Sequence, residues 1–225
     1  MRKFRGSRIM LALLGAVTAG LAAMPAIAQA DGVTLPLAAI TGTSPCSDPV
    51  LTQALLGFGD ANLYALAPGQ SVDSFDGTGW TLLGNASIVP TDLFDGSTGS
   101  VLDLPSGSAA ISPEVCVNST YRSARVMVRD LSGSDNVSFY VVYPHRHGHG
   151  SKSHRHGHGS NYSWGTSQDV DGSPSASDGW ALSDPFKLAP GSATGWQVAR
   201  FAFVAGGQGN ESQLYDFYLD PYSRG

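Results

Sequence analysis

The stretch Ser123–Tyr143 alternates apolar and polar positions with a period of two. Residues 124–129 place Ala, Val and Val on one face of a strand, and residues 137–143 repeat the pattern with Val, Phe, Val and Tyr. Such alternation of β-branched and aromatic residues predicts two half-buried strands. Because the link at residues 132–136 consists of Ser, Gly, Asp and Asn, we expect the two strands to form an antiparallel hairpin.

Short apolar segments separated by turn residues continue on both sides of this hairpin. Nothing from Asp31 onward shows a sustained helical period. A series of roughly nine to eleven short strands, spaced by about 8 to 12 residues, is typical of a β-sandwich. The sequence therefore predicts an all-β fold, a two-sheet antiparallel jelly-roll sandwich. The further predicted strands are residues 62–66, 71–75, 80–83, 86–89, 100–104, 108–111, 180–182, 185–188, 196–204 and 213–220.

The first thirty residues have the order of a secretory signal peptide. Four basic residues at positions 2–8 precede an apolar run at 9–28, and Ala28-Gln29-Ala30 is a small-residue cleavage site. We expect cleavage after Ala30 and secretion, with an uncleaved signal anchor as the alternative. No later apolar run approaches the ~20 residues that a transmembrane helix needs, so we expect no stable membrane insertion after cleavage.

Cleavage changes the length and the charge of the chain. The mature chain has 225 minus 30, or 195, residues, which suits one domain at 46–225 after an N-terminal segment at 31–45. It loses four of thirteen basic residues and none of eighteen acidic ones, so its net charge is nine minus eighteen, or −9. Such an acidic secreted protein is a poor candidate for binding nucleic acid. The oligomeric state does not follow from the sequence.

The two cysteines, Cys46 and Cys116, are expected to form a disulfide, because the destination is oxidising and their number is even. The bond closes a long loop, and the resulting loss of entropy in the unfolded chain should stabilise the fold by about 4 kcal/mol. Two free thiols acting as metal ligands are the alternative, which the absence of a Cys-x-x-Cys spacing disfavours.

All six histidines lie in a block at residues 145–160, within a loop that we expect to be a flexible insertion at 144–160. The motif His-Arg-His-Gly-His-Gly-Ser occurs twice in it, nine residues apart. Neutral imidazoles bind Zn²⁺, Ni²⁺ and Cu²⁺, and the glycines let neighbouring rings converge. An inert insertion and a pH-sensitive basic loop are the alternatives. The predicted metal ligands are His145, His147, His149, His154, His156 and His158.

The sequence offers little for catalysis. No histidine lies outside the block, so a packed Ser-His-Asp arrangement is not available. Glu114 and Glu211 are the only glutamates, and most aspartates adjoin Gly, Ser or Pro, as turn residues do. We therefore expect no catalytic residues and no enzymatic activity.

The last predicted strand has an apolar face, made by Tyr215, Phe217 and Leu219, and a polar face. We interpret the polar face as a candidate glycan-binding surface, with Trp164 near its rim, and the other tryptophans, which open strands, as core residues. A solvated sheet face is the alternative, and two carboxylates of this face are candidate Ca²⁺ ligands. The residues of the polar face are Asp216, Tyr218 and Asp220.

Several segments together resemble a family of secreted bacterial proteins, mostly uncharacterised, that have one jelly-roll domain. The closing strand is also similar to that of galactose-binding-like jelly rolls and carbohydrate-binding modules. The resemblance implies the fold and export, but no catalytic residues. The segments are Cys46, Phe58-Gly59-Asp60, Tyr64 to Gly69, Gly79 to Leu82, Leu102 to Pro105, Ser112 to Val117 and Tyr215 to Tyr222.

These observations predict a secreted, non-catalytic binding protein with transition-metal affinity through its histidine-rich hairpin loop. The alternatives are a carbohydrate-binding module, whose partner is a glycan or cell-surface polymer, and a purely structural extracellular protein.

Overall fold

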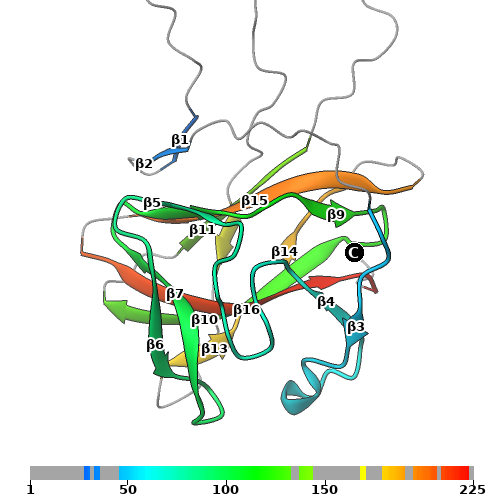
Figure 1. Ribbon diagram of the computed structural model, residues 1–225, viewed down its shortest axis with the longest axis horizontal. Helices are drawn as coiled ribbons and strands as arrows, with labels where there is room; N and C mark the ends of the chain where they lie inside the picture. The colour runs from blue at the N-terminus through cyan, green and yellow to red at the C-terminus, as the bar shows by residue number, and fades with distance from the viewer. Residues whose placement is uncertain are drawn as a thin grey trace, which may run out of the picture.

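The computed structural model describes residues 28–30, 33–35, 46–132, 137–143, 168–170, 179–190, 195–206 and 209–222. Within these ranges the chain forms strands and one short 3-10 helix, η1 (Leu56–Phe58), and no α-helix. Two antiparallel sheets pack face to face, with β5, β9 and β15 above β7, β10 and β16 in Figure 1. The all-β, two-sheet prediction is therefore confirmed.

The larger sheet has eight strands and is organised around β16 (Glu211–Asp220). One edge of β16 pairs along its length with β10 (Ser123–Ser132). Its other edge is shared, because residues 211–214 pair with β7 (Thr98–Pro105) and residues 218–219 pair with β4 (Tyr64–Leu66). The remaining strands are β3 (Leu51–Thr52), β6 (Ser87–Asp92), β13 (Trp180–Leu182) and β14 (Phe186–Lys187).

The smaller sheet has six strands and is organised in the same way around β15 (Gln197–Ala205). One edge of β15 pairs with β11 (Val137–Val142), and the other is shared by β8 (Ala109–Ile111) and β9 (Val115–Val117). The outermost strands are β5 (Thr81–Leu83) and β12 (Gln168–Val170).

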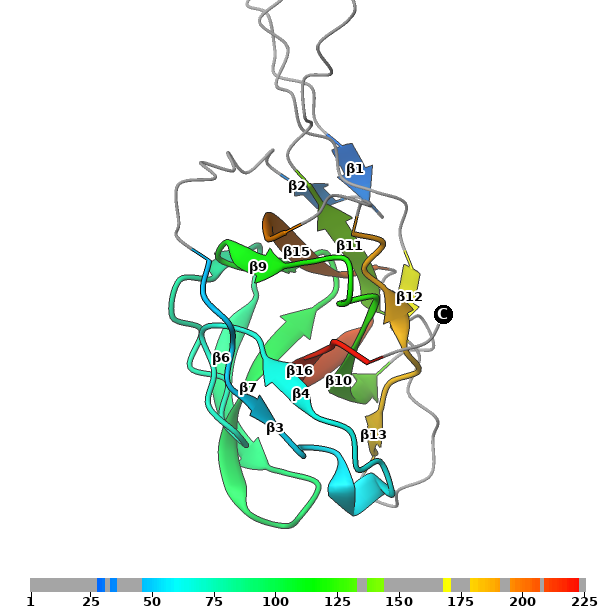
Figure 2. The same cartoon turned by 90° about the vertical axis from the view of Figure 1, so that its right-hand side faces the viewer.

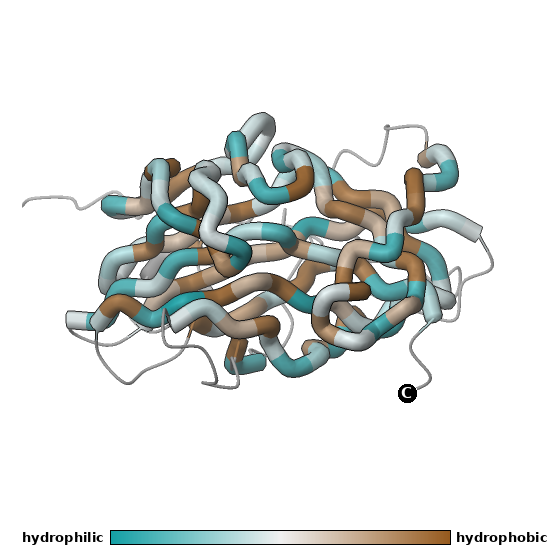
Figure 3. Tube along the Cα trace, turned by 90° about the horizontal axis from the view of Figure 1, so that it is seen from below, coloured by the Kyte–Doolittle hydropathy of each residue, from teal (hydrophilic) through white to brown (hydrophobic). Residues whose placement is uncertain are grey.

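An aromatic core fills the space between the sheets. Phe217 of the larger sheet meets Phe201 and Phe203 of the smaller one edge to face, with ring centroids 5.4 and 5.2 Å apart. Each buried aromatic side chain stabilises the fold by about 1.5–3 kcal/mol relative to exposure. Trp80 is buried here against Phe203, as predicted from its position at a strand start. Trp180 is also buried, but on the outer face of the larger sheet against Tyr215, and Trp196 is only partly buried. In Figure 3, seen from the side of the larger sheet, apolar and polar residues alternate along the strands.

The predicted hairpin at Ser123–Tyr143 is wrong, although both of its strands are present. β10 lies in the larger sheet and β11 in the smaller one, so the two strands do not pair with each other. Alternation shows that a strand has a buried face, but both strands bury such a face, and the pattern does not select their neighbours. Residues 71–75 are also not a strand, but a tight turn closed by one bridge between Ser71 and Ser74.

The disulfide between Cys46 and Cys116 is confirmed, with Cα atoms 5.6 Å apart. It ties the chain that precedes β3 of the larger sheet to β9 of the smaller sheet. The bond therefore links the two layers covalently.

The N-terminal strands β1 (Ala28–Ala30) and β2 (Val33–Leu35) pair with each other beside the smaller sheet (Figure 2). Leu35 is fully buried against the outer face of that sheet, where it joins a cluster with Ile111 and Val204. β1 coincides with the last three residues of the predicted signal peptide, so cleavage after Ala30 would separate β1 from β2. No helix in the described ranges is long and apolar enough to cross a membrane.

Candidate functional site

A β-bulge interrupts the central strand β16. Tyr218 pairs with Arg125 and Tyr215 pairs with Met127, so two residues of β16 lie opposite one residue of β10. The first of the two, Asp216, has a φ of 54°. A residue other than glycine in this left-handed region costs of order 1–3 kcal/mol, so the surrounding structure must hold it there.

The bulge changes which side chains of β16 face outward. Before the bulge, Leu214 faces the core, and after it Phe217 and Leu219 do so. Tyr215 therefore lies on the outer face with Tyr218. The predicted apolar face of Tyr215, Phe217 and Leu219 is corrected accordingly, because a strict period of two does not survive an inserted residue.

The outer face of β16 is not solvated, which excludes the alternative interpretation of this strand. Asp216, Tyr218 and Asp220 have exposed fractions of 6, 1 and 7%. Three loops fold across this face, cover Asp216 and Tyr218, and contact different parts of it.

The first loop is the turn between β6 and β7, residues 93–97. The backbone N–H of Phe94 donates a hydrogen bond to the hydroxyl oxygen of Tyr215 at 3.3 Å. The turn is closed by hydrogen bonds from the Leu93 amide to the Ser97 carbonyl and from the Ser97 amide to the Asp95 carboxylate, both 2.8 Å. Tyr215 thus fixes the position of Phe94.

The second loop, residues 67–75, crosses the gap that β7 and β4 leave along β16. The amide of Asp73 donates to the Asp216 carboxylate at 3.0 Å. The side-chain amide of Gln70 pairs with both backbone groups of Phe217, at 3.1 and 3.3 Å, and so replaces a neighbouring strand there. The loop lies so close to Gly99 that a Cβ at this position would come within 2.2 Å of the Asp73 carbonyl oxygen.

The third loop contains η1. Leu55 precedes it and is buried in a small cluster with Tyr64 and Tyr218, whose rings lie 6.2 Å apart. The Tyr64 hydroxyl donates to the carboxylate of Asp60, which ends the loop. This cluster holds η1 on β16.

Together the three loops present exposed apolar side chains on the outer side of the larger sheet, where η1 and the β6–β7 turn lie at the bottom of Figures 1 and 2. The rings of Phe58 and Phe94 contact each other, with centroids 4.9 Å apart, and are 40 and 43% exposed. Leu56 and Val72 are each 56% exposed on the same loops. Four of the seven large exposed apolar side chains in the described ranges therefore belong to these loops. We call residues 56–60, 72–73 and 94–95 the loop surface.

The carboxylate beneath the loop surface has an unusual environment. Burial raises the pKa of Asp216 to about 6, against hydrogen bonds from the Asp73 amide and the Tyr218 hydroxyl, which lower it. The negative charge of Asp73 raises it further. Asp216 and Tyr218 thus belong to the support of the loop surface, and neither side chain reaches solvent.

The remaining predicted site residues lie elsewhere. Asp220 accepts hydrogen bonds from the Ser123 hydroxyl and the Tyr222 amide, at 3.3 and 2.7 Å. Trp164 and the six histidines lie outside the described residues, so their metal or ligand binding stays a prediction. Among the residues that the structure describes, no three His, Cys, Asp or Glu side chains lie close enough to hold a metal ion.

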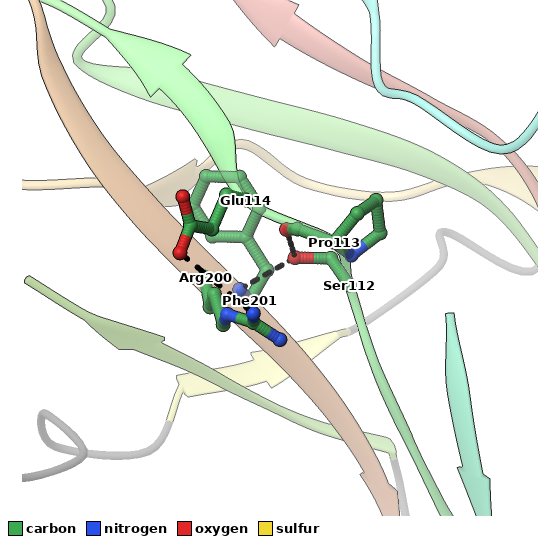
Figure 4. A network of polar contacts seen from close by, with 5 residues as sticks. All are labelled: Ser112, Pro113, Glu114, Arg200 and Phe201. Carbon is green, nitrogen blue, oxygen red and sulfur yellow. Dashed lines mark hydrogen bonds and ion pairs between the residues drawn. The ribbon is translucent and has the colours of Figure 1, made fainter. Parts of the chain in front are cut away.

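A second polar network lies on the smaller sheet (Figure 4). Arg200 of β15 forms an ion pair with Glu114 at 3.8 Å. The Ser112 hydroxyl accepts a hydrogen bond from the Phe201 amide and donates to the Pro113 carbonyl, at 2.9 and 2.8 Å. These contacts fasten the link between β8 and β9 onto β15, which is a structural role.

Phe58 and Phe94, the two aromatic residues of the loop surface, were not predicted from the sequence. A usable signal was present, because Phe58 stands between two glycines and Phe94 precedes Asp95-Gly96. An aromatic residue inside a turn sequence has no strand neighbours to cover it, and is therefore a candidate for an exposed ring.

Comparison with known proteins adds little to the assignment of a function. No protein-family model and no curated protein matches the chain. A solved structure that matches is the enzymatically active domain of bacteriophage CBA120 tailspike protein 4, with 13% identity and a TM-score of 0.32. The match covers 63% of this chain and 19% of the tailspike chain. Because that domain is enzymatically active, the match overturns our expectation of a chain without catalytic activity, although the likeness assigns no residue, substrate or reaction to it.

Proposed function

We propose that this chain is a secreted glycan-binding protein whose loop surface is the binding site. The observation that carries the proposal is the contact between Phe58 and Phe94, two rings that are each more than a third exposed. The faces of aromatic rings are electron-rich and pack against the C–H groups of sugar rings, while nearby carboxylates accept hydrogen bonds from sugar hydroxyls. Asp73 and Asp95 supply such acceptors beside the rings.

The three loops are held in place by buried residues of β16, which favours a binding site over an incidental exposed surface. Tyr215, Asp216 and Tyr218 are all buried, and each holds one loop. A site whose loops are held before binding loses less conformational entropy when the ligand binds. The exposed apolar area is confined to four side chains, which suits one or two sugar rings better than the roughly 800 Å² that a stable protein partner covers.

We also propose that the strands are connected as in a jelly roll and that the chain is secreted. The two-sheet sandwich with β16 at its centre supports the first, and the N-terminal leader pattern supports the second.

The test is a binding panel of soluble hexasaccharides of glucose, N-acetylglucosamine, glucosamine, mannose and galacturonic acid. We expect at least one to bind, and the double variant Phe58→Ala/Phe94→Ala to lose about tenfold or more of that affinity. Leu131→Ala is the matched control, because Leu131 is also exposed, by 45%, but lies on β10. If the double variant binds as the wild type does, the loop surface is not the site.

A second proposed property is transition-metal affinity, and the doubled His-Arg-His-Gly-His-Gly-Ser motif favours it. The chain that carries the motif joins β11 and β12, which pair as antiparallel neighbours. Zn²⁺ or Ni²⁺ binding, measured by calorimetry at pH 7.5, should disappear when all six histidines are replaced by Ser. Retained binding would assign the metal to other ligands, and the histidine block would be an inert insertion.

A further inference from the structure

The loop surface carries negative charge beside its aromatic rings. Asp95 directly follows Phe94, and Asp73 directly follows Val72, and both acidic residues are exposed. Partial burial raises the pKa of Asp73, and the charge of Asp95 raises it further. Asp73 in turn acts on Asp216 beneath it. Asp73 is therefore repelled by the carboxylate of Asp95 at this surface and by that of Asp216 beneath it.

Among the basic residues of the described chain, Arg125 acts on the loop surface, because the pKa of Asp60 is lowered by the hydrogen bond from Tyr64 and also by the charge of Arg125. Others lie away from Asp73 and Asp95. Arg200 forms an ion pair with Glu114 on the smaller sheet, and no other ion pair occurs among the described residues. Arg129 lies 4.5 Å over the ring of Trp180, and Lys187 lies on β14 at the far edge of the larger sheet. Within the described ranges, neither Asp73 nor Asp95 of the loop surface, nor Asp216 beneath it, forms an ion pair with a basic residue.

We propose that the loop surface selects a glycan with primary amino groups, such as an oligomer of glucosamine, over N-acetylated and uronic-acid glycans. This inference rests on the proposed function, because it names the glycan class that the same site takes. The rings of Phe58 and Phe94 pack against the sugar, and the ammonium groups pair with Asp73 and Asp95. Exposed aromatic rings also attract ammonium groups directly. A uronic acid instead brings a like charge to the surface, which disfavours it.

The experiment compares hexamers of glucosamine, N-acetylglucosamine and galacturonic acid by calorimetry with the full chain at about pH 5.5, where the glucosamine amines are protonated, and at low salt. The variant Asp73→Asn/Asp95→Asn keeps the shape of both side chains and removes two charges. Its matched control is Asp48→Asn/Asp169→Asn, which removes two charges from exposed aspartates that precede β3 and lie on β12. We expect the wild type and the control to prefer the glucosamine hexamer about tenfold, and the Asp73/Asp95 variant to bind both aminosugar hexamers equally.

The Phe58/Phe94 variant and a lysine hexamer show whether a negative result contradicts this inference or the proposed function. If binding depends on Phe58 and Phe94 but the wild type shows no preference for glucosamine, or the Asp73/Asp95 variant keeps it, this inference is overturned and the proposed function stands. If no hexamer shows ring-dependent binding, the proposed function fails and the inference fails with it. A lysine hexamer that binds as tightly as the glucosamine hexamer would show that the surface recognises charge alone, which also overturns the inference.

Discussion

The carboxylate of Asp216 accepts a hydrogen bond from the backbone amide of Asp73 at 3.0 Å, and both residues have a positive φ, 54° and 60°. One residue forms the bulge in the central strand of the larger sheet, and the other forms the turn that lies over it. A left-handed backbone at either residue is unfavourable on its own. The hydrogen bond between Asp216 and Asp73 stabilises both left-handed conformations at once. The bulge and the loop surface are therefore expected to form and to be lost together.

Replacing Asp216 tests this coupling. Asp216→Ala removes the acceptor for the Asp73 amide and the Tyr218 hydroxyl and leaves an alanine at positive φ. We expect a loss of about 2–4 kcal/mol in the free energy of unfolding. Asp216→Gly also removes the acceptor but tolerates the backbone, so it should be about 1 kcal/mol more stable than the alanine variant. Urea unfolding measures both, and equal stability of the two would show that the backbone of the bulge is not strained.

The raised pKa of Asp216 predicts a pH dependence with a definite sign. The folded protein holds this proton up to about pH 6, whereas the unfolded chain releases it near 3.8. The folded state thus binds more protons between these values, and the contribution of Asp216 to stability falls as the pH rises through this window.

The size of this effect is measured against Asp216→Asn, which does not titrate. Relative to that variant, the wild type should lose about 2–3 kcal/mol between pH 4 and pH 6.5. Parallel urea titrations across this range provide the measurement. A constant difference between the two proteins would show that the carboxylate is already ionised in the folded state at pH 4.

Gly99 is predicted to be necessary for the second loop. A Cβ at this position would come within 2.2 Å of the Asp73 carbonyl oxygen, so Gly99→Ala must push the loop away from the β6–β7 hairpin. We expect a destabilisation of about 1–3 kcal/mol together with weaker glycan binding. Gly57→Ala is the control for stability alone, because nothing lies within 4 Å of a Cβ there and its φ is ordinary, although Gly57 belongs to the loop surface. Equal stability of the two variants would place the loop farther from the hairpin.

The disulfide is predicted to supply a large part of the stability. Its two cysteines are 70 residues apart, and replacing both with Ser should lower the free energy of unfolding by about 4 kcal/mol. Reduction of the wild type should give the same shift in urea midpoint, because both treatments remove the same restraint from the unfolded chain. A shift in the Ser variant without a shift in the reduced wild type would mean that the Ser side chains, and not the lost bond, cause the change.

The sequence allowed the strands to be predicted better than their arrangement. The alternation in β10 correctly placed Ala124 and Val128 on the inner face, but it could not show that the next strand belongs to the other sheet. β15 gives the reason: Phe201 and Phe203 face the core while Val198 and Val204 are covered on the outer face, so both of its faces are apolar. Neighbours of such strands are set by long-range pairing, which local patterns do not contain.

The candidate site was predicted only in part, and for a related reason. Asp216 and Tyr218 were identified from the polar face of the last strand, but the bulge and the covering loops make them supports of the surface. A bulge depends on a register between distant strands, so it leaves little trace in one sequence. The exposed rings of Phe58 and Phe94 come from turns 36 residues apart in the chain (94 minus 58), and only the fold brings them into contact.

The central claim is that three loops supported by β16 form one glycan-binding surface. Backbone amide chemical shifts, recorded by NMR while the tightest-binding hexasaccharide of the panel is added, test it most directly. We predict the largest shift changes in residues 56–60, 72–73 and 94–95, with little change in β12 and β15. Changes centred on the smaller sheet, with those loops unaffected, would contradict the account.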